Sequence, residues 1–266
     1  MTIIVSTSEG ETTTLEETGV ENEDELQRYI YENPECIPLD KYKDGSEILI
    51  LARELPTQSG PVDAVGLDQD GEIYIIETKL FKNRDKRRVM AQVLDYGAGL
   101  WSTYRDPNDF VERLRSSVDE KFGTRLETKL ESAFGIDEPE LEDFLSAVRA
   151  NVAEGRFRFV VLMNRIQDPL KDVIRFVNRN SRFDVFGVEL DFYEYGDLDI
   201  LAPALYGAEV EKMPDGSGGS TRRRWDRKSF FEDAESRLST ESKEYQAVRE
   251  VFDWAEKHAD EVSWGT

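Results

Sequence analysis

Cysteine and histidine are almost absent from this sequence of 266 residues. A single cysteine, Cys36, cannot form an intramolecular disulfide and excludes a zinc site built from several cysteines. The single histidine, His258, excludes a histidine-rich metal site, and a Ser-His-Asp triad would depend on that one residue. No apolar run is long enough to span a bilayer and no N-terminal signal is evident. We therefore expect a soluble, cytoplasmic protein with no membrane partner.

Positive charge is also scarce, with 34 Lys and Arg residues against 56 Asp and Glu and a net charge of −22. The acidic excess is spread along the chain, and arginine outnumbers lysine. We interpret this as a halophilic adaptation, the alternative being an ordinary acidic protein. At molar salt the Debye length falls to about 3 Å, so the net charge does not exclude a nucleic-acid partner.

Hydrophobic residues make up 39% of the chain, enough for a core, and their patterns predict four regions. These are an N-terminal arm (1–20), a core (21–206), a Gly-rich and basic linker (207–228) and a helical C-terminal segment (229–266). Within the core we predict helices at 22–33, 85–102 and 168–180, a helical insert at about 107–155, strands at 48–52 and 158–163, a two-stranded hairpin at 61–80 and a final strand at 185–193. This order predicts an α/β fold in which helices cover a sheet.

The hairpin, PVDAVGLDQDGEIYIIETKL, carries the charged residues of most interest. If Gln69-Asp70-Gly71 forms a three-residue loop, Asp63 lies directly opposite Glu77, and Lys79 shares the face of Glu77. Two carboxylates would then stand about 5 Å apart with an ammonium beside them, which predicts a metal site. A two-residue loop would instead place Asp63 opposite Thr78 and remove that site.

These residues carry a resemblance to a known family. Pro61-Val62-Asp63 followed by Glu77-Thr78-Lys79 resembles the motif of the PD-(D/E)XK, or restriction-endonuclease-like, nuclease superfamily, although Val62 separates the proline from the aspartate. The element order resembles the αβββαβ core of that superfamily over residues 21–195. The chain is most similar to the branch of archaeal mismatch and branched-DNA endonucleases and RecB-type nucleases, many of which carry Gln-x-x-x-Tyr on the next helix, here Gln92 and Tyr96.

The resemblance implies a metal-dependent endonuclease that hydrolyses DNA with Mg²⁺ or Mn²⁺. Asp63 and Glu77 would supply the oxygen ligands that Mg²⁺ prefers, and a bound divalent cation lowers the pKa of an attacking water. Lys79 would orient or deprotonate that water or stabilise charge in the transition state. The alternative for these three residues is a solvated ion-pair cluster.

Two helical positions extend this implied site. The family often places a glutamate on the first helix, which makes Glu23 a further candidate metal ligand; the alternative is an acidic residue favoured by the helix dipole. Gln92 is polar on an otherwise apolar helix face and would contact the site or the nucleic-acid backbone. Tyr96 would contact nucleic acid or serve as a core tyrosine.

The segment from Lys79 to Arg88, KLFKNRDKRR, has six basic residues and one acidic residue, which reverses the overall sign of charge. Such a reversal is typical of a phosphate-binding surface, so we predict DNA contacts from the basic residues Lys82, Arg84, Arg87 and Arg88. A second patch, Arg222–Lys228 with Trp225, is either a further nucleic-acid contact or a flexible basic linker. The rival function is a non-catalytic nucleic-acid-binding or scaffold protein with the same fold. A homodimer or a partner protein is possible in either case.

Overall fold

The structure is a computed structural model that describes residues 3–6, 8, 10–20, 22–81, 86–210, 212, 230–231, 234 and 242–258. The chain divides into two compact units, Met1–Lys212 and Met213–Thr266. In the second unit, helix α8 (Lys243–His258) carries Tyr245 and Phe252, and the ring of Phe231 packs against both. The patch Arg222–Lys228 with Trp225 lies outside the described residues, as does most of the first part of the predicted helical C-terminal segment (229–241).

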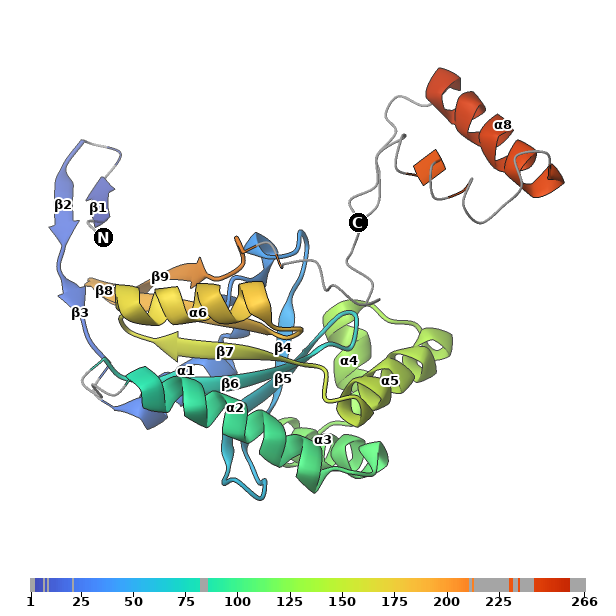
Figure 1. Cartoon of the computed structure of the whole chain (residues 1–266). Helices are drawn as coiled ribbons and strands as arrows, with labels where there is room; N and C mark the ends of the chain where they lie inside the picture. Colours follow the sequence, from blue (N-terminus) through green and yellow to red (C-terminus); the bar gives the residue numbers. More distant parts are fainter. Residues whose placement is uncertain are drawn as a thin grey trace. The chain divides into compact units, whose positions relative to one another are not determined.

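A seven-stranded mixed sheet forms the centre of the first unit (Figure 1). Its strands are β3 (Glu17–Thr18), β4 (Ile48–Leu55), β5 (Val62–Asp68), β6 (Ile73–Lys79), β7 (Phe157–Met163), β8 (Asp184–Tyr195) and β9 (Leu198–Tyr206). The order is β3-β8-β7-β6-β5-β4, with β9 paired to β8. Neighbours β4, β5 and β6 run antiparallel, whereas β6, β7 and β8 run parallel.

Helices cover the sheet in the predicted order. These are α1 (Glu23–Glu32), α2 (Lys86–Thr103), α3 (Pro107–Phe122), α4 (Leu126–Phe134), α5 (Glu138–Ala153) and α6 (Asp168–Asn180), with short 3₁₀ turns η1 (Pro34–Cys36) and η2 (Leu39–Lys41) after α1. The series α1-β4-β5-β6-α2-β7 confirms the predicted αβββαβ core, and α3 to α5 form the helical insert before β7. Among the described residues, no helix combines the length and apolar character needed to cross a bilayer.

Two differences concern the ends of the sheet. The strand predicted to be final is followed by β9, which pairs antiparallel with β8 over its whole length, so that prediction was wrong. Pro203 lies inside β9, and a proline inside a run argues against a strand unless the strand pairs along one edge only. At the other terminus, β1 (Ile3–Ser6) and β2 (Thr12–Leu15) form a two-stranded sheet, and β3 joins the main sheet.

The sheet is buried on both faces, as the long apolar runs within its central strands β5, β6 and β7 indicate. On β6, Ile73 and Ile75 belong to the core under α2 to α6, whereas Tyr74 and Ile76 belong to the core under α1. Side chains alternate along a strand, so Glu77 and Lys79 continue the α2 face to the end of β6.

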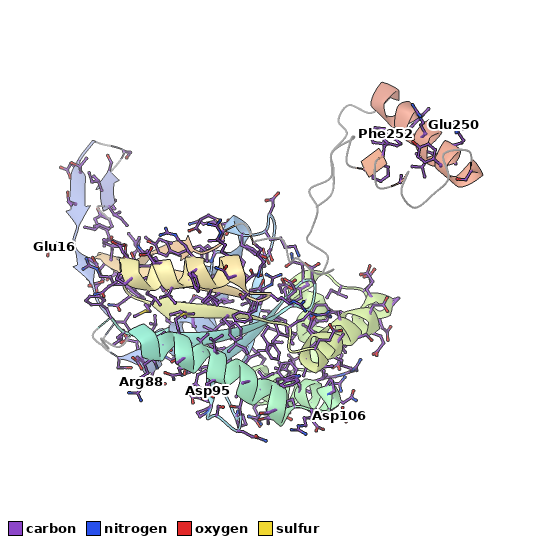
Figure 2. The ribbon with its side chains drawn as sticks, in the orientation of Figure 1. Glu16, Arg88, Asp95, Asp106, Glu250 and Phe252 are labelled. Carbon is purple, nitrogen blue, oxygen red and sulfur yellow. The ribbon has the colours of Figure 1, made fainter. Side chains whose placement is uncertain are left out.

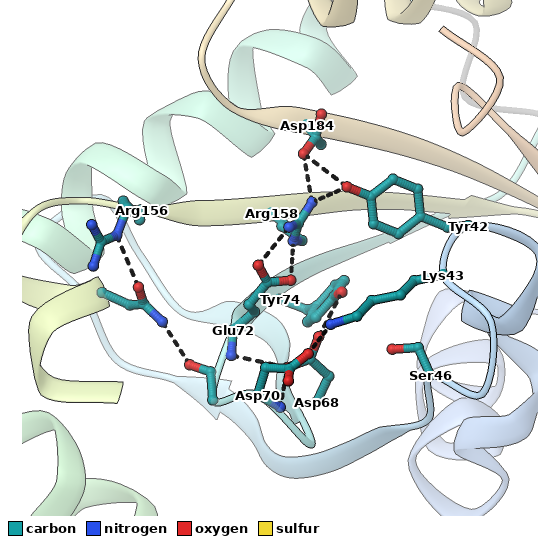
Figure 3. Close-up of polar contacts among 12 residues, drawn as sticks. Tyr42, Lys43, Ser46, Asp68, Asp70, Glu72, Tyr74, Arg156, Arg158 and Asp184 are labelled. Atoms are coloured by element: carbon teal, nitrogen blue, oxygen red, sulfur yellow. Dashed lines mark hydrogen bonds and ion pairs between the residues drawn. The ribbon is translucent and has the colours of Figure 1, made fainter. Parts of the chain in front are cut away.

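A half-buried ion-pair network surrounds Arg158 at the start of β7 (Figure 3). The guanidinium of Arg158 donates two hydrogen bonds of 2.6 Å to Glu72 and further bonds to Asp184 and the Tyr42 hydroxyl. The contact with Glu72 lowers the pKa of that carboxyl against the opposing effect of burial. The network thereby joins β7, β8, the residue before β6 and the segment after η2.

Candidate active site

The β5–β6 turn has the predicted three-residue loop. Gly71 has φ +72°, its N–H donates to the Asp68 carbonyl, and the Asp68 N–H donates to the Glu72 carbonyl. Paired positions run from Leu67 opposite Ile73 to Ala64 opposite Ile76. The next pair in this register is Asp63 and Glu77, which confirms the predicted register and removes the alternative with Thr78 opposite Asp63.

Asp63 stands at the start of β5 and is half-buried. Its Oδ2 accepts hydrogen bonds of 2.8 Å from both the backbone N–H and the hydroxyl of Thr78. Burial raises the pKa of Asp63, and these bonds and the charge of Lys79 oppose that rise. One carboxylate oxygen is thus held by the neighbouring strand, which fixes the orientation of the group.

Glu77 is fully buried, and Lys79 Nζ lies 2.7 Å from its Oε1. Among the described residues, no donor makes a well-oriented hydrogen bond to either Glu77 oxygen. Burial, together with the charge of Asp63, raises the pKa of Glu77 to about 7, although Lys79 opposes the shift. A carboxylate in this environment is stabilised by a positive charge nearby.

Lys79 and Glu23 meet where β6 ends. Lys79 Nζ lies 3.3 Å from Glu23 Oε2, and Glu23 Oε1 accepts a hydrogen bond of 3.2 Å from the Leu80 N–H. Burial lowers the pKa of Lys79, but its contacts with Glu77 and the nearby carboxylates outweigh that effect, and the net shift is upward. The first residue of α1 is therefore brought to the end of β6.

Helix α2 brings Gln92 and Tyr96 to the same region. Gln92 Nε2 donates a 2.8 Å hydrogen bond to the Tyr96 hydroxyl, and the Tyr96 ring is buried in the core under α2. Burial raises the pKa of Tyr96, and the charges of Glu77 and Asp63 add to the rise. The polar side chain of Gln92 thus has the Tyr96 hydroxyl as its partner within the helix.

The carboxylates of Asp63 and Glu77 provide some, but not all, of the oxygen ligands that a hard divalent cation needs. Within the described part of the chain, no three or more Asp, Glu, His or Cys side chains are grouped so that they could hold a metal ion. Asp63 and Glu77 supply carboxylate oxygens, and the two Glu77 oxygens are buried without a well-oriented donor. Buried carboxylate oxygens of this kind fit Mg²⁺ or Mn²⁺, with Glu23 directed to Lys79.

The predicted DNA-contacting residues are only partly described. Lys82 and Arg84 lie outside the described residues, and Arg87 belongs to α2 with its side chain outside them. Arg88 is exposed in the first turn of α2, on the surface of the helix (Figure 2). Arg88 therefore lies on the same helix as Gln92 and Tyr96, the two α2 residues near the carboxylate pair.

Sequence reasoning missed Glu54 on β4. Arg53 pairs with Ala64 and Leu55 with Val62, so Glu54 is the neighbour of Asp63 on β4. Glu77 is the neighbour of Asp63 on the other side, on β6. Glu54 has φ +49°, the sole positive φ at a non-glycine position among the described residues. The buried Gln27 on α1 donates a 2.8 Å hydrogen bond to Glu54. A register shift between Ile50 and Ala52 sets this pairing, and no local sequence signal marks it.

Fold and site together define a mixed α/β protein with paired carboxylates and a lysine at the end of a central strand. No protein-family model matches the chain, and no curated protein matches it either. The chain is similar to a crystal structure of a repair endonuclease from Pyrococcus abyssi, with 17% sequence identity and a TM-score of 0.29. The match covers 65% of this chain and 50% of that one, so it spans about half the length of that protein. A likeness at this level does not define an activity or a substrate.

Proposed function

We propose that the chain is a metal-dependent nuclease that hydrolyses phosphodiester bonds in DNA. The observation that carries the proposal is the row at the end of β6, where Asp63 faces Glu77 and Lys79 Nζ lies 2.7 Å from Glu77 and 3.3 Å from Glu23. Carboxylates with raised pKa values beside a half-buried cation are typical of functional sites. The motif resemblance, Asp63 with Glu77-Thr78-Lys79, is to a superfamily of nucleases.

Each residue has a role that its contacts suit. Asp63 and Glu77 would hold the divalent cation, which when bound neutralises phosphate charge and acidifies an attacking water. The bonds from Thr78 keep Asp63 in one orientation, so the site is preorganised. Lys79 would hold the attacking water or the non-bridging phosphate oxygen, and Glu23, 3.3 Å from the ammonium, would help to position it. Gln92 and Tyr96 would contact the substrate from α2.

A cleavage assay tests this proposal directly. Single-stranded, duplex, mismatched and branched DNA are incubated with the full chain at high salt, with Mg²⁺, Mn²⁺ or EDTA. We expect cleavage with either metal, none with EDTA, and a loss of at least about 100-fold in Asp63→Ala and Lys79→Ala, since positioned catalytic groups contribute about that much. Unchanged cleavage by both variants would refute the assignment of the site.

A matched control separates loss of chemistry from loss of packing. Lys171 has the same side-chain exposure as Lys79, 17%, and also lies near a carboxylate, Asp168. Lys171→Ala should therefore retain cleavage where Lys79→Ala loses it. If the parent binds DNA and cleaves none of the four substrates with either metal, the non-catalytic binding protein is the correct reading.

A further inference from the structure

An exposed arginine lies in the loop that follows β7. Arg165 is exposed, and its guanidinium carbon lies 5.5 Å from the centroid of the Phe81 ring. A guanidinium group is attracted to the face of an aromatic ring. When it stacks there, its N–H donors point outward in a plane parallel to the ring. In the described part of the chain, no carboxylate forms an ion pair with Arg165, so its positive charge is not neutralised by a partner there.

Strand pairing brings this loop to the candidate site. β6 and β7 run parallel, and Lys79 pairs with Met163, so the loops after both strands leave the sheet at one edge. Neighbouring strands are about 5 Å apart, and Arg165 follows Met163 by two residues. Ligands of open α/β sheets bind outside the carboxyl ends of the parallel strands, which is this edge.

Hydrogen bonds on both sides hold the loop in place. The Phe81 N–H donates 2.8 Å to Asn164 Oδ1, which joins the loop to the segment after Lys79. The Ile166 N–H donates 2.5 Å to Glu189 on β8, and Ile166 itself is buried. Arg165 therefore stands between two fixed residues, so little ordering would be needed when it binds a ligand.

We propose that Arg165, stacked on Phe81, binds a phosphate of the nucleic-acid backbone next to the phosphate that Lys79 engages. The inference rests on the proposed function, because it takes the substrate to be a polynucleotide. Guanidinium groups bind phosphate through two parallel N–H donors, and phosphate contacts fix the position of a strand without reading its sequence. Arg165 would thus set the path of the backbone as it leaves the site.

The test is equilibrium binding of fluorescently labelled DNA to the full chain in EDTA, by anisotropy, over a series of salt concentrations. We expect Arg165→Gln to weaken binding about tenfold for every sequence and to reduce the salt slope by about one, as the loss of one phosphate contact does. Phe81→Leu keeps the charge and removes the ring, so it should weaken binding about threefold.

Arg179→Gln is the matched control. Arg179 is exposed in the last turn of α6, which runs from the loop after β7 back to the start of β8, so it lies at the opposite edge of the sheet. The control should bind DNA like the parent. Circular dichroism of each variant checks that the fold is retained.

The outcomes separate this inference from the proposed function. If the parent cleaves DNA and Arg165→Gln binds with unchanged affinity and salt slope, the phosphate contact is refuted and the nuclease proposal stands. If the parent binds without cleaving and Arg165→Gln is weakened while Arg179→Gln is not, the contact is supported and the nuclease proposal fails. Equal weakening in both arginine variants would refute a specific contact at Arg165.

Discussion

Replacing Arg158 with alanine should lower the free energy of unfolding by about 3 kcal/mol, the lower end of the cost of breaking a buried pair, because it leaves two half-buried carboxylates without this cation. Arg158 is 13% exposed, and its partners Glu72 and Asp184 are 23% and 17% exposed. The two bonds to Glu72 are 2.6 Å each, a bidentate geometry that charge-assisted pairs favour. Asp184 keeps Lys212 at 2.9 Å, so Glu72 bears most of the loss.

Arg156 offers a control two residues earlier in the sequence. It also forms an ion pair, with Glu154 at 2.5 Å, but the two side chains are 56% and 57% exposed. Exposed ion pairs contribute about 0–1 kcal/mol, so Arg156→Ala should cost no more than that. Both variants remove one arginine, but Arg158→Ala removes two ion pairs and Arg156→Ala removes one. Two exposed pairs would contribute at most about 2 kcal/mol, so a larger cost for Arg158→Ala reports the effect of burial.

Urea unfolding of the full chain, followed by far-UV circular dichroism, measures both values. A double variant, Arg158→Met with Glu72→Gln, removes the cation and its main partner charge together. It should be more stable than Arg158→Ala, because a neutral pair leaves less uncompensated charge behind. Equal costs for Arg158→Ala and Arg156→Ala would refute the claim that burial makes this network important.

Three other predictions concern local features. Burial and the charge of Glu72 raise the pKa of Asp68 to about 6, so its stabilising contribution is full below pH 4 and is lost as pH rises through 6. The free energy of unfolding of Asp68→Asn should therefore rise by about 2 kcal/mol relative to that of the parent as the pH increases from 4 to 7, measured by urea unfolding at each pH. Glu54→Gly should be about 1 kcal/mol more stable than Glu54→Ala in thermal melts, because both lose the Gln27 bond and glycine alone tolerates φ +49°. Gly97→Ala should cost about 1–3 kcal/mol in urea unfolding, since its Cβ would lie 2.7 Å from the Phe159 ring; no loss would mean that the ring moves freely.

The parts of the fold that depend on local sequence were predictable. The turn Gln69–Gly71 sets the β5–β6 register within a few residues, so Asp63 and Glu77 could be paired from sequence. The bounds of α6 agree with the predicted 168–180, because Leu170, Ile174 and Val177 mark its apolar face.

The parts that depend on distant pairing were not predictable. A register shift inside β4 places Glu54 beside Asp63. Pro203 argues against a strand in the sequence of β9, although the segment pairs with β8. Arg165 stands near Lys79 because two parallel strands pair across the helical insert, and the sequence around Arg165 carries no sign of this. The pairing of two parallel strands depends on the whole sheet and not on a short turn. Residues that this pairing brings together can therefore be identified only from the structure.

The long crossover between β6 and β7 has a consequence for the order in which the protein folds. The β5–β6 hairpin is a local contact that can form within microseconds, whereas pairing β7 to β6 must first close a loop that contains α2 to α5. Asn151, near the end of α5, donates a 2.8 Å hydrogen bond to the Gly71 carbonyl in the hairpin turn. The carboxylate pair can therefore assemble early, while the Arg165 loop reaches Lys79 only after the insert has collapsed onto the turn. Refolding kinetics would then show Asn151→Ala slowing the late phase, if that contact forms in the transition state.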